Sequence, residues 1–274
     1  MSRAYHAKKA TPEDRTGPVS KSTLCAFAKS PWKWAHSPPT EPTAAMQLGS
    51  IVHGIALEDQ RRGDDLEWIV SPYDSFRTKE AREWKEEKAE AGLMVLTEKE
   101  YFKAHAIALR ARRAVQRAVR DEIGGEDFPA YSVEVEVGGS FNEVDLCGLI
   151  DVVPEKPQIL LDLKTCSSIG DERALSRVIF DRDYHMQGAL YCDLYAHQHN
   201  LQEPPGFGFV FIETVSPYET TYVKLSDAAL ALGRQRYIAL VEMWKRLREV
   251  NISDLPGAVQ EGTIIEPPGW LAPV

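Results

Sequence analysis

The chain has 274 residues, 43% of them apolar and 27% charged, which is the composition of an ordinary globular domain. It contains no run of the roughly 18 apolar residues that a membrane helix needs, and residues 1–11 carry charges without the apolar stretch of a secretory signal. The net charge of −9 argues against a protein that binds nucleic acid non-specifically over its whole surface.

The first 128 residues are predicted to be mostly helical, after a disordered leader over residues 1–19. The elements predicted in this part are a helix that Ser20 caps and that closes near Pro31, a helix over 43–59, a strand over 68–70, a loop over 71–79, a helix over 80–91 and a long helix that Thr97 caps and that runs to about residue 122.

From Tyr131 the apolar residues alternate with polar ones, which is typical of a half-buried strand, and Gly138-Gly139 is predicted to form a hairpin turn. The elements predicted from here are strands over 131–137, 141–153 and 158–164, helices over 172–180 and 184–199, strands over 206–214 and 218–225, and a helix over 226–249. This order predicts an α/β fold with a central mixed β-sheet flanked by helices. We expect a single domain over 20–274, with a helical N-terminal decoration over 20–128, a core over 129–250 and a tail over 251–274.

The cysteines predict neither a structural zinc site nor an iron–sulfur cluster. Cys25, Cys147, Cys166 and Cys192 are scattered and include no Cys-x-x-Cys pair. Cys147 and Cys166 lie in apolar strands and are expected to be small core residues. This usage fits a reducing, cytoplasmic location, and no membrane association is expected.

Two acids and a lysine stand out in the predicted buried strands. Asp151 lies in one apolar strand, and Asp162 and Lys164 flank Leu163 in the next. Because a strand alternates its side chains, Asp162 and Lys164 must point the same way. Ionised groups are costly in apolar strands unless they pair or bind a metal. A buried salt bridge would explain one acid and the lysine, and the second acid favours a divalent-metal site that faces a lysine.

Such a site suits phosphodiester hydrolysis, which requires charge stabilisation on a phosphate oxygen, an activated water and a stabilised leaving oxygen. Mg²⁺ prefers oxygen ligands and keeps several waters, so Asp151, Asp162 and the carbonyl of Leu163 would suffice as ligands. Lys164 would orient or deprotonate the attacking water, or balance charge in the transition state.

The acid–acid–lysine set resembles the PD-(D/E)XK nuclease superfamily, with its restriction-endonuclease-like core. Gln187 and Tyr191, four residues apart on one helix face, resemble the Q-x-x-x-Y element of the RecB-type branch. His53, four residues after Gly49, resembles the upstream histidine ligand of that branch. This resemblance implies two Mg²⁺ ions, with Mn²⁺ tolerated because one ligand is a histidine.

Further sequence blocks resemble the RecE-like (exonuclease VIII type) phage recombination exonucleases over roughly residues 20–250. The blocks are 71–74, 77–80, 162–165, 184–187, 209–213 and 217–218. The resemblance implies a Mg²⁺-dependent 5′–3′ exonuclease on linear double-stranded DNA, which leaves 3′ single-stranded overhangs for recombination by strand annealing. It also implies a bacterial or phage-encoded protein, a ring-like homo-oligomer and a single-strand annealing protein as partner.

The remaining candidate residues each have a plainer alternative. His53 could simply be a packed histidine, and Gln187 and Tyr191 could position the lysine or the scissile strand, or only pack in the core. Glu134 could bind metal through water or lie on a solvated strand face. Arg77 and Lys79 could grip a 5′ phosphate or form an ordinary charged loop.

A basic stripe is predicted on the long helix, because residues 103–120 contain six Lys or Arg and no acid. Arg110, Arg113, Arg117 and Arg120 recur at helical spacing and could follow DNA or form a solvated helix face. The alternative functions are an endonuclease of the same superfamily and a non-catalytic DNA-binding scaffold. The complete acid–acid–lysine set favours catalysis over a scaffold.

Overall fold

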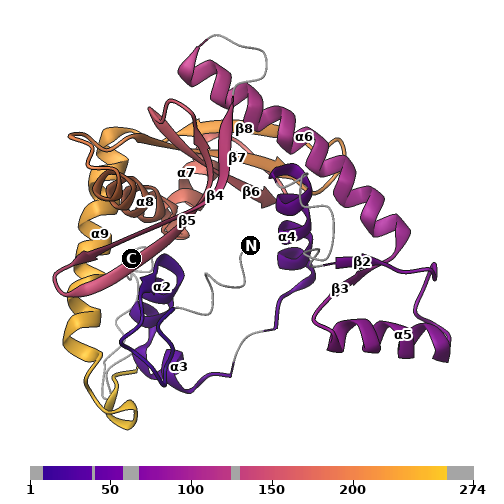
Figure 1. Cartoon of the computed structure of the whole chain (residues 1–274), viewed down its shortest axis with the longest axis horizontal. Helices are drawn as coiled ribbons and strands as arrows, with labels where there is room; N and C mark the ends of the chain where they lie inside the picture. The colour runs from indigo at the N-terminus through magenta and orange to yellow at the C-terminus, as the bar shows by residue number, and fades with distance from the viewer. Residues whose placement is uncertain (1–8, 39–40, 58–67, 125–129, 258–274) are drawn as a thin grey trace, which may run out of the picture.

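The computed structural model describes residues 9–38, 41–57, 68–124 and 130–257. Its centre is a six-stranded mixed sheet (Figure 1). The strands of this sheet are β1 (Val19–Ser20), β4 (Tyr131–Phe141), β5 (Val144–Pro154), β6 (Ile159–Cys166), β7 (Gly206–Glu213) and β8 (Thr220–Lys224). The predicted fold class, a central mixed sheet flanked by helices, is confirmed.

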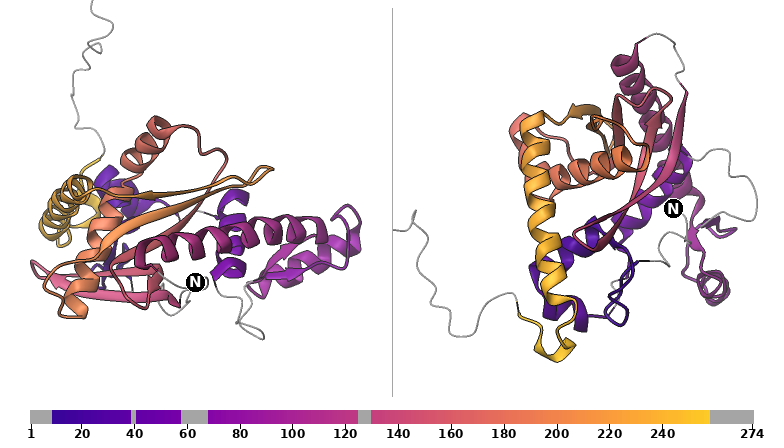
Figure 2. Two further views of the ribbon diagram at one scale, coloured as in Figure 1. Left: turned by 90° about the horizontal axis from the view of Figure 1, so that it is seen from above. Right: turned by 60° about the vertical axis from the view of Figure 1, so that its left-hand side comes forward.

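Helices cover both faces of this sheet (Figure 2). The helices are α2 (Lys21–Lys29), α3 (Pro31–His36), α4 (Ala44–Leu57), α5 (Lys79–Glu90), α6 (Glu98–Ile123), α7 (Glu172–Asp181), α8 (Tyr184–Gln198) and α9 (Asp227–Leu247), followed by the 3₁₀ turn η1 (Ile252–Asp254). A small parallel pair, β2 (Trp68–Val70) and β3 (Met94–Leu96), lies apart from the main sheet. The sequence patterns did not predict β1, α3 or β3, each of which has six residues or fewer.

Strand β7 shows how the two layers are held together. Its aromatic residues, among them Phe207 and Phe209, pack with α2, α8 and α9 on one face. Val210 and Ile212 pack with α4 and α6 on the other. A strand buried on both faces needs apolar residues at nearly every position, and β7 has them. Helices α4 and α6 therefore form one complete layer of the fold.

The edge of β5 decides the arrangement of the sheet. Strand β4 pairs antiparallel with β5 along its whole length, so β1 and β6 must share the opposite edge. Strand β1 pairs in parallel with Leu146 and Cys147 near the start of β5. Strand β6 pairs antiparallel through Val152 and Leu161. Between the two pairings, residues 148–151 of β5 face a gap in the sheet.

The predicted hairpin turn at Gly138-Gly139 is wrong. Strand β4 continues through both glycines, and the chain reverses at Asn142 and Glu143, whose φ angles of 48° and 64° form the two-residue turn. Asn142 donates to Glu242 on α9, and the carbonyl of Glu143 accepts from Arg248, the residue that follows this helix. Contacts with α9 therefore fix the turn at this position, and the sequence window around the glycines carries no sign of them.

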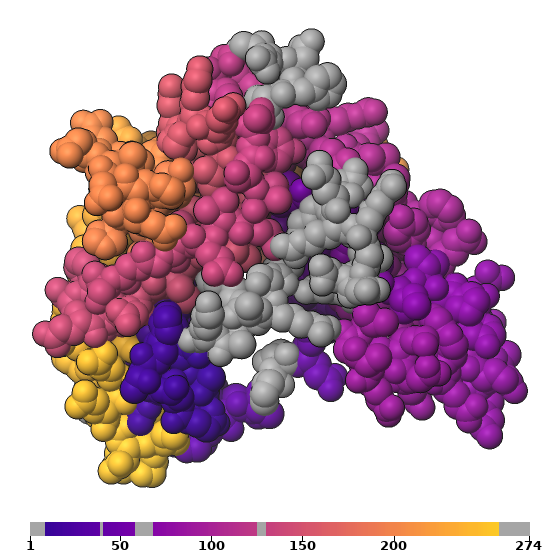
Figure 3. Space-filling model, viewed as in Figure 1, coloured from indigo at the N-terminus to yellow at the C-terminus, as the bar shows by residue number. Residues whose placement is uncertain are grey.

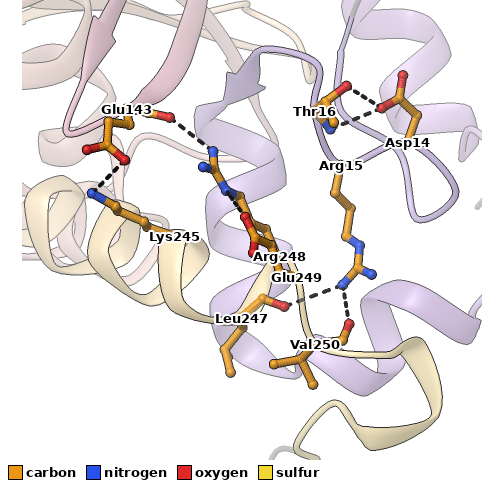
Figure 4. A network of polar contacts seen from close by, with 9 residues as sticks. All are labelled: Asp14, Arg15, Thr16, Glu143, Lys245, Leu247, Arg248, Glu249 and Val250. Atoms are coloured by element: carbon orange, nitrogen blue, oxygen red, sulfur yellow. Dashed lines mark hydrogen bonds and ion pairs between the residues drawn. The ribbon is translucent and has the colours of Figure 1, made fainter.

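The predicted leader is also shorter than expected, although residues 1–8 lie outside the described part of the chain. Ala10 is buried in the core, and Arg15 donates to the carbonyls of Leu247 and Val250 at the end of α9 (Figure 4). Residues 9–19 are thus placed by tertiary contacts. The other predictions that fall outside the described residues concern 39–40, 58–59, Gly125 and the tail from residue 258 on.

Helix α6 is the longest helix described, and its ends and faces follow its sequence. Thr97 and Glu100 form a capping box at its start. Residues such as Ile107 and Val115 are buried against the sheet and α4. Arg112 donates to the carbonyls of Ile55 and Ala56 and so caps the end of α4.

Strands β2 and β3 and helix α5 form a lobe beside the start of α6, visible at the lower right of Figure 3. Within the described residues, no helix is long and apolar enough to cross a membrane.

The contact between α8 and α9 generates a stability prediction. A Cβ atom at Gly233 would overlap the carbonyl oxygen of His185. We expect Gly233→Ala to lower the free energy of unfolding by about 1–3 kcal/mol, because a backbone contact cannot yield without separating the helices. Urea unfolding measures this change. Leu232→Ala, at an exposed position of the same helix, should change it by less than about 0.5 kcal/mol. Equal effects of the two substitutions would contradict this packing.

Candidate active site

The gap along β5 contains the acids that the sequence singled out. Strands β5 and β6 separate beyond the pair Val152 and Leu161. At this point the carboxylate of Asp151 takes the place of a backbone acceptor, because its Oδ2 accepts a hydrogen bond of 2.8 Å from the Leu163 amide. The N–H and C=O groups of one strand residue project to the same edge, so the Leu163 carbonyl also faces the gap. The Leu163 side chain is buried in the core, as predicted.

Asp151 is held in an environment that disfavours its charge. Burial, and then the neighbouring charge of Asp162, raise the pKa of Asp151 to about 6. His53, on α4, lies with its Nδ1 3.5 Å from Asp151 Oδ2 and partly offsets both effects when it is charged. The structure therefore brings the predicted histidine ligand to the first acid.

Asp162 and Lys164 form an ion pair on the face of β6 that α8 covers. Lys164 Nζ lies 2.5 Å from Asp162 Oδ1, and the second oxygen, Oδ2, accepts from Gln187 Nε2 of α8. Asp162 is only 3% exposed. Gln187 thus contacts the acid and not the lysine, and it holds the acid in position. The Oδ1 contact with Lys164 lacks hydrogen-bond geometry, which leaves this oxygen able to accept another partner.

Two aromatic rings support Lys164. Its Nζ lies 5.0 Å from the ring centre of Tyr184 and 5.9 Å from that of Phe209. Burial alone would lower the pKa of Lys164, but Asp162 and Asp151 raise it above its ordinary value. Lys164 is therefore a cation in this arrangement, suited to charge stabilisation.

Tyr191 lies one helical turn after Gln187 and packs against β5 from the same side. A Cβ atom at Gly148 would come within 2.6 Å of the Tyr191 ring, so the glycine makes room for it. Burial, followed by the charge of Asp162, raises the pKa of Tyr191, which keeps the phenol protonated. Tyr191 thus serves as a neutral group that fixes α8 over the gap.

The donors present fit a hard divalent cation that keeps much of its water. Asp151, whose pKa is raised, the carboxylate of Asp162 with an oxygen able to accept a further partner, and the Leu163 carbonyl meet in the gap. Among the described residues, no three His, Cys, Asp or Glu side chains lie close enough to form a complete cage. A cation here would rely on Asp151, Asp162, the Leu163 carbonyl and water, with His53 beside Asp151.

Glu134 lies opposite Asp151 in the sheet. Val133 pairs with Val152 and Val135 with Ile150, which places Glu134 across from the acid. Its φ angle is +50°, a conformation that non-glycine residues adopt at a cost. The structure thus places the predicted outer-shell acid next to the site, on strained backbone.

The predicted DNA contacts are not brought together with the acids. Arg77 and Lys79 lie in the exposed lobe formed by β2, β3 and α5, where Lys79 pairs with Glu83. Arg110, Arg113 and Arg117 are exposed on the outer face of α6.

A hollow of about 540 Å³ lies elsewhere, between Pro18, the β4–β5 hairpin and Gln198. Its lining includes none of the acids in the gap. The candidate site is therefore the gap itself, with the residues that border it.

Sequence reasoning missed two residues that border the site. Tyr184 was noticed only as part of a family block, and Lys21 was not singled out. Neither residue belongs to a motif that indicates a particular chemistry. Lys21 directly follows a two-residue strand that no sequence pattern predicts. The only available signal was the Ser20 cap, which puts Lys21 in the first turn of a helix.

The sequence over residues 18–257 matches the family described as the PD-(D/E)XK nuclease superfamily. Among solved structures, the chain is similar to a protein of Eubacterium rectale described as a candidate exonuclease, with a TM-score of 0.57 and 15% identity over 98% of this chain and 95% of that one. At this identity the likeness concerns the fold.

A second solved structure, of the protein SSO0001, has a TM-score of 0.29 at 14% identity, over 74% of this chain and 88% of that one, too low to support an argument. No curated protein matches the sequence.

The raised pKa of Asp151 generates a prediction for the metal-free protein. An acid with a higher pKa in the folded state keeps its proton to higher pH, so stability falls as pH rises from about 4 to about 6 and then levels off. Asp151→Asn keeps an oxygen for the Leu163 amide and removes this penalty. We expect it to raise the free energy of unfolding above pH 6 by roughly 1–3 kcal/mol.

Thermal or urea unfolding from pH 4 to 8 with a chelator tests this expectation. Asp145→Asn, an exposed acid on the same strand, is the matched control. If Asp151→Asn does not raise the free energy of unfolding at pH 7, the buried charge of Asp151 does not carry the expected cost.

Gln187 generates a second prediction from the site. Gln187→Leu leaves a buried carboxylate oxygen of Asp162 without its donor, which should lower stability by about 1–3 kcal/mol and lower any metal-dependent activity more than tenfold. Urea unfolding and turnover measured on the same preparation check the two effects. Gln198→Leu, at the far end of the same helix, should leave activity unchanged, and an equal loss there would contradict a specific role for Gln187.

Proposed function

Because the chain belongs to the PD-(D/E)XK nuclease superfamily, we propose that it is a divalent-metal-dependent deoxyribonuclease that digests linear double-stranded DNA from its 5′ ends. The observation that carries this proposal is the gap along β5, where Asp151, Asp162 and Lys164 meet beneath Gln187. A structural ion pair with Lys164 would need only one acid. Burying the charge of a second acid costs free energy unless that acid binds a ligand such as a metal ion.

The residues of the gap divide the work of hydrolysis. Asp151, Asp162 and the Leu163 carbonyl would hold Mg²⁺, or Mn²⁺, and the bound metal would polarise the phosphate and lower the pKa of a bound water. Lys164, a cation supported by two rings, faces the same space and stabilises negative charge on the scissile phosphate. Gln187 keeps Asp162 oriented, and Tyr191 holds α8 in place.

The exonuclease assignment rests on the resemblance of the sequence blocks to RecE-like exonucleases. The likeness in fold to the candidate exonuclease of Eubacterium rectale, over nearly the full length of both chains, agrees with it. On this basis we also propose that the products carry 3′ overhangs for strand annealing, that a single-strand annealing protein is the partner, and that two ions act in a ring-like oligomer.

The basic face of α6 is proposed as part of the DNA path. Arg110, Arg113 and Arg117 are exposed and no acid occurs from residue 103 to residue 120. A duplex lying along this face would be held through its phosphates, which suits an enzyme that does not select sequence. Arg77 and Lys79, on the lobe of β2, β3 and α5, are proposed to contact the DNA end.

A nuclease assay tests the proposal. The purified protein with Mg²⁺ should digest linear duplex DNA and leave closed circular duplex intact, with activity lost in a chelator. Lys164→Met should lower the rate by at least about 10²-fold, because it removes a cation that acts in the transition state. End-labelled substrates show the direction of digestion.

Lys156→Met, at an exposed lysine between β5 and β6, is the matched control and should digest at the wild-type rate. Cutting of closed circles would support the endonuclease alternative and overturn the exonuclease. Metal-independent binding without any digestion, unchanged in Lys164→Met, would indicate a DNA-binding scaffold.

A further inference from the structure

Strand β1 places a second lysine, Lys21, beside the gap. Strand β1 runs parallel to β5 and is paired with Leu146 and Cys147, so the chain leaves β1 heading toward residues 148–151. Lys21 is the next residue after β1 and the first of α2. Because β1 and β6 share one edge of β5, Lys21 enters the gap from the side opposite β6.

Lys21 and Lys164 contact the same aromatic ring. Lys21 Nζ lies 5.3 Å from the ring centre of Tyr184, and Lys164 Nζ lies 5.0 Å from it. The two ammonium groups therefore lie no more than about 10 Å apart, a range that includes the spacing of neighbouring phosphates on one DNA strand. Tyr184 itself packs on Phe209 of the core, which fixes the ring that both lysines contact.

Lys21 makes no ion pair with a described carboxylate. Its Nζ donates to the carbonyl oxygen of Arg182 at 2.7 Å, and within the described residues no carboxylate lies at ion-pair distance from it. Asp183, the residue after Arg182, pairs with Arg236. Burial lowers the pKa of Lys21, and the charge of Lys164 lowers it further, while Cys25, Asp183 and Asp162 offset part of this.

A half-buried ammonium that is repelled by another is costly unless an anion joins it. The hydrogen bond to the Arg182 carbonyl ties α2 to the segment between α7 and α8, but an uncharged donor would tie them without this cost. The arrangement is instead suited to an anion that spans both lysines, and a DNA strand carries such charges in a row.

We propose that Lys21 binds a phosphate adjacent to the scissile phosphate on the cleaved strand, while Lys164 faces the scissile phosphate itself. The inference rests on the proposed function and assigns to it a substrate-binding residue outside the acid–acid–lysine set. Lys21 would fix the register of the strand, because a strand held at two successive phosphates cannot slide by a fraction of a nucleotide.

The test compares Lys21→Met with Lys29→Met, a control at an exposed lysine in the last turn of the same helix. Binding of a linear duplex without divalent metal is measured as a function of salt concentration. Lys21→Met should reduce the slope of log affinity against log salt by about one, because one phosphate contact is lost. With Mg²⁺, kcat/KM should fall about tenfold or more. Lys29→Met should change neither, and Lys21→Arg should keep the slope.

Neutral phosphates locate the contact without relying on the variant's stability. Substrates carrying one methylphosphonate on either side of the scissile phosphate are digested by the wild type and by Lys21→Met. At one of these two positions, the methylphosphonate should lower the activity of the wild type by about the same factor as the Lys21→Met substitution does on unmodified DNA. At that position the methylphosphonate should not lower the activity of Lys21→Met any further. At phosphates farther along the strand, the loss caused by the methylphosphonate and the loss caused by Lys21→Met should multiply.

An unchanged salt slope in Lys21→Met, or multiplying losses at every position, would overturn the proposal and leave Lys21 as a structural tie. If the wild type digests no DNA, the proposed function fails, whereas the salt slope still decides whether Lys21 contacts phosphate.

Discussion

The constraint on which the site depends is the interruption of hydrogen bonding along one edge of β5. Strand β6 leaves this edge after a single paired position, and β1 takes up the edge farther along. The backbone groups between them would be unsatisfied in a buried sheet, which is costly. Asp151 solves part of this problem by accepting from the Leu163 amide. A carboxylate thus becomes part of the sheet at the gap.

The carboxylate of Asp151 places a negative charge in the protein interior, where other groups have to stabilise it. Asp151 meets Asp162, and the two carboxylates share one lysine, so the pKa of Asp151 rises while Lys164 stays protonated. Helix α8 adds two neutral groups, Gln187, which donates to Asp162, and Tyr191, which packs on β5 at Gly148. Two neighbouring carboxylates, of which Asp162 pairs with Lys164, are prepared for a divalent metal. The same buried charges that cost free energy in the unliganded protein are the groups expected to bind the metal.

The flanking helices are specified by the same sheet. Strand β7 is apolar on both sides, so both layers of helices have to pack on it, and α4 carries His53 into one layer while α8 carries Gln187 into the other. The acids are therefore approached from both layers. The cations on α6 and Lys21 belong to different layers as well.

The sequence by itself predicted most of the helices and strands and singled out the residues of the inner site. Alternation in β6 fixed Asp162 and Lys164 on one side, helical spacing put Gln187 and Tyr191 on one face, and caps such as Ser20 and Thr97 marked helix starts, because each of these depends on residues close in the chain. The tertiary structure decided what depends on distant residues. It moved the hairpin turn from Gly138-Gly139 to Asn142 and Glu143, where α9 binds it, it anchored residues 9–19, and it brought Lys21 to Tyr184. A two-residue strand carries too little pattern to be recognised, and its position is set by the edge of β5 that other strands leave open.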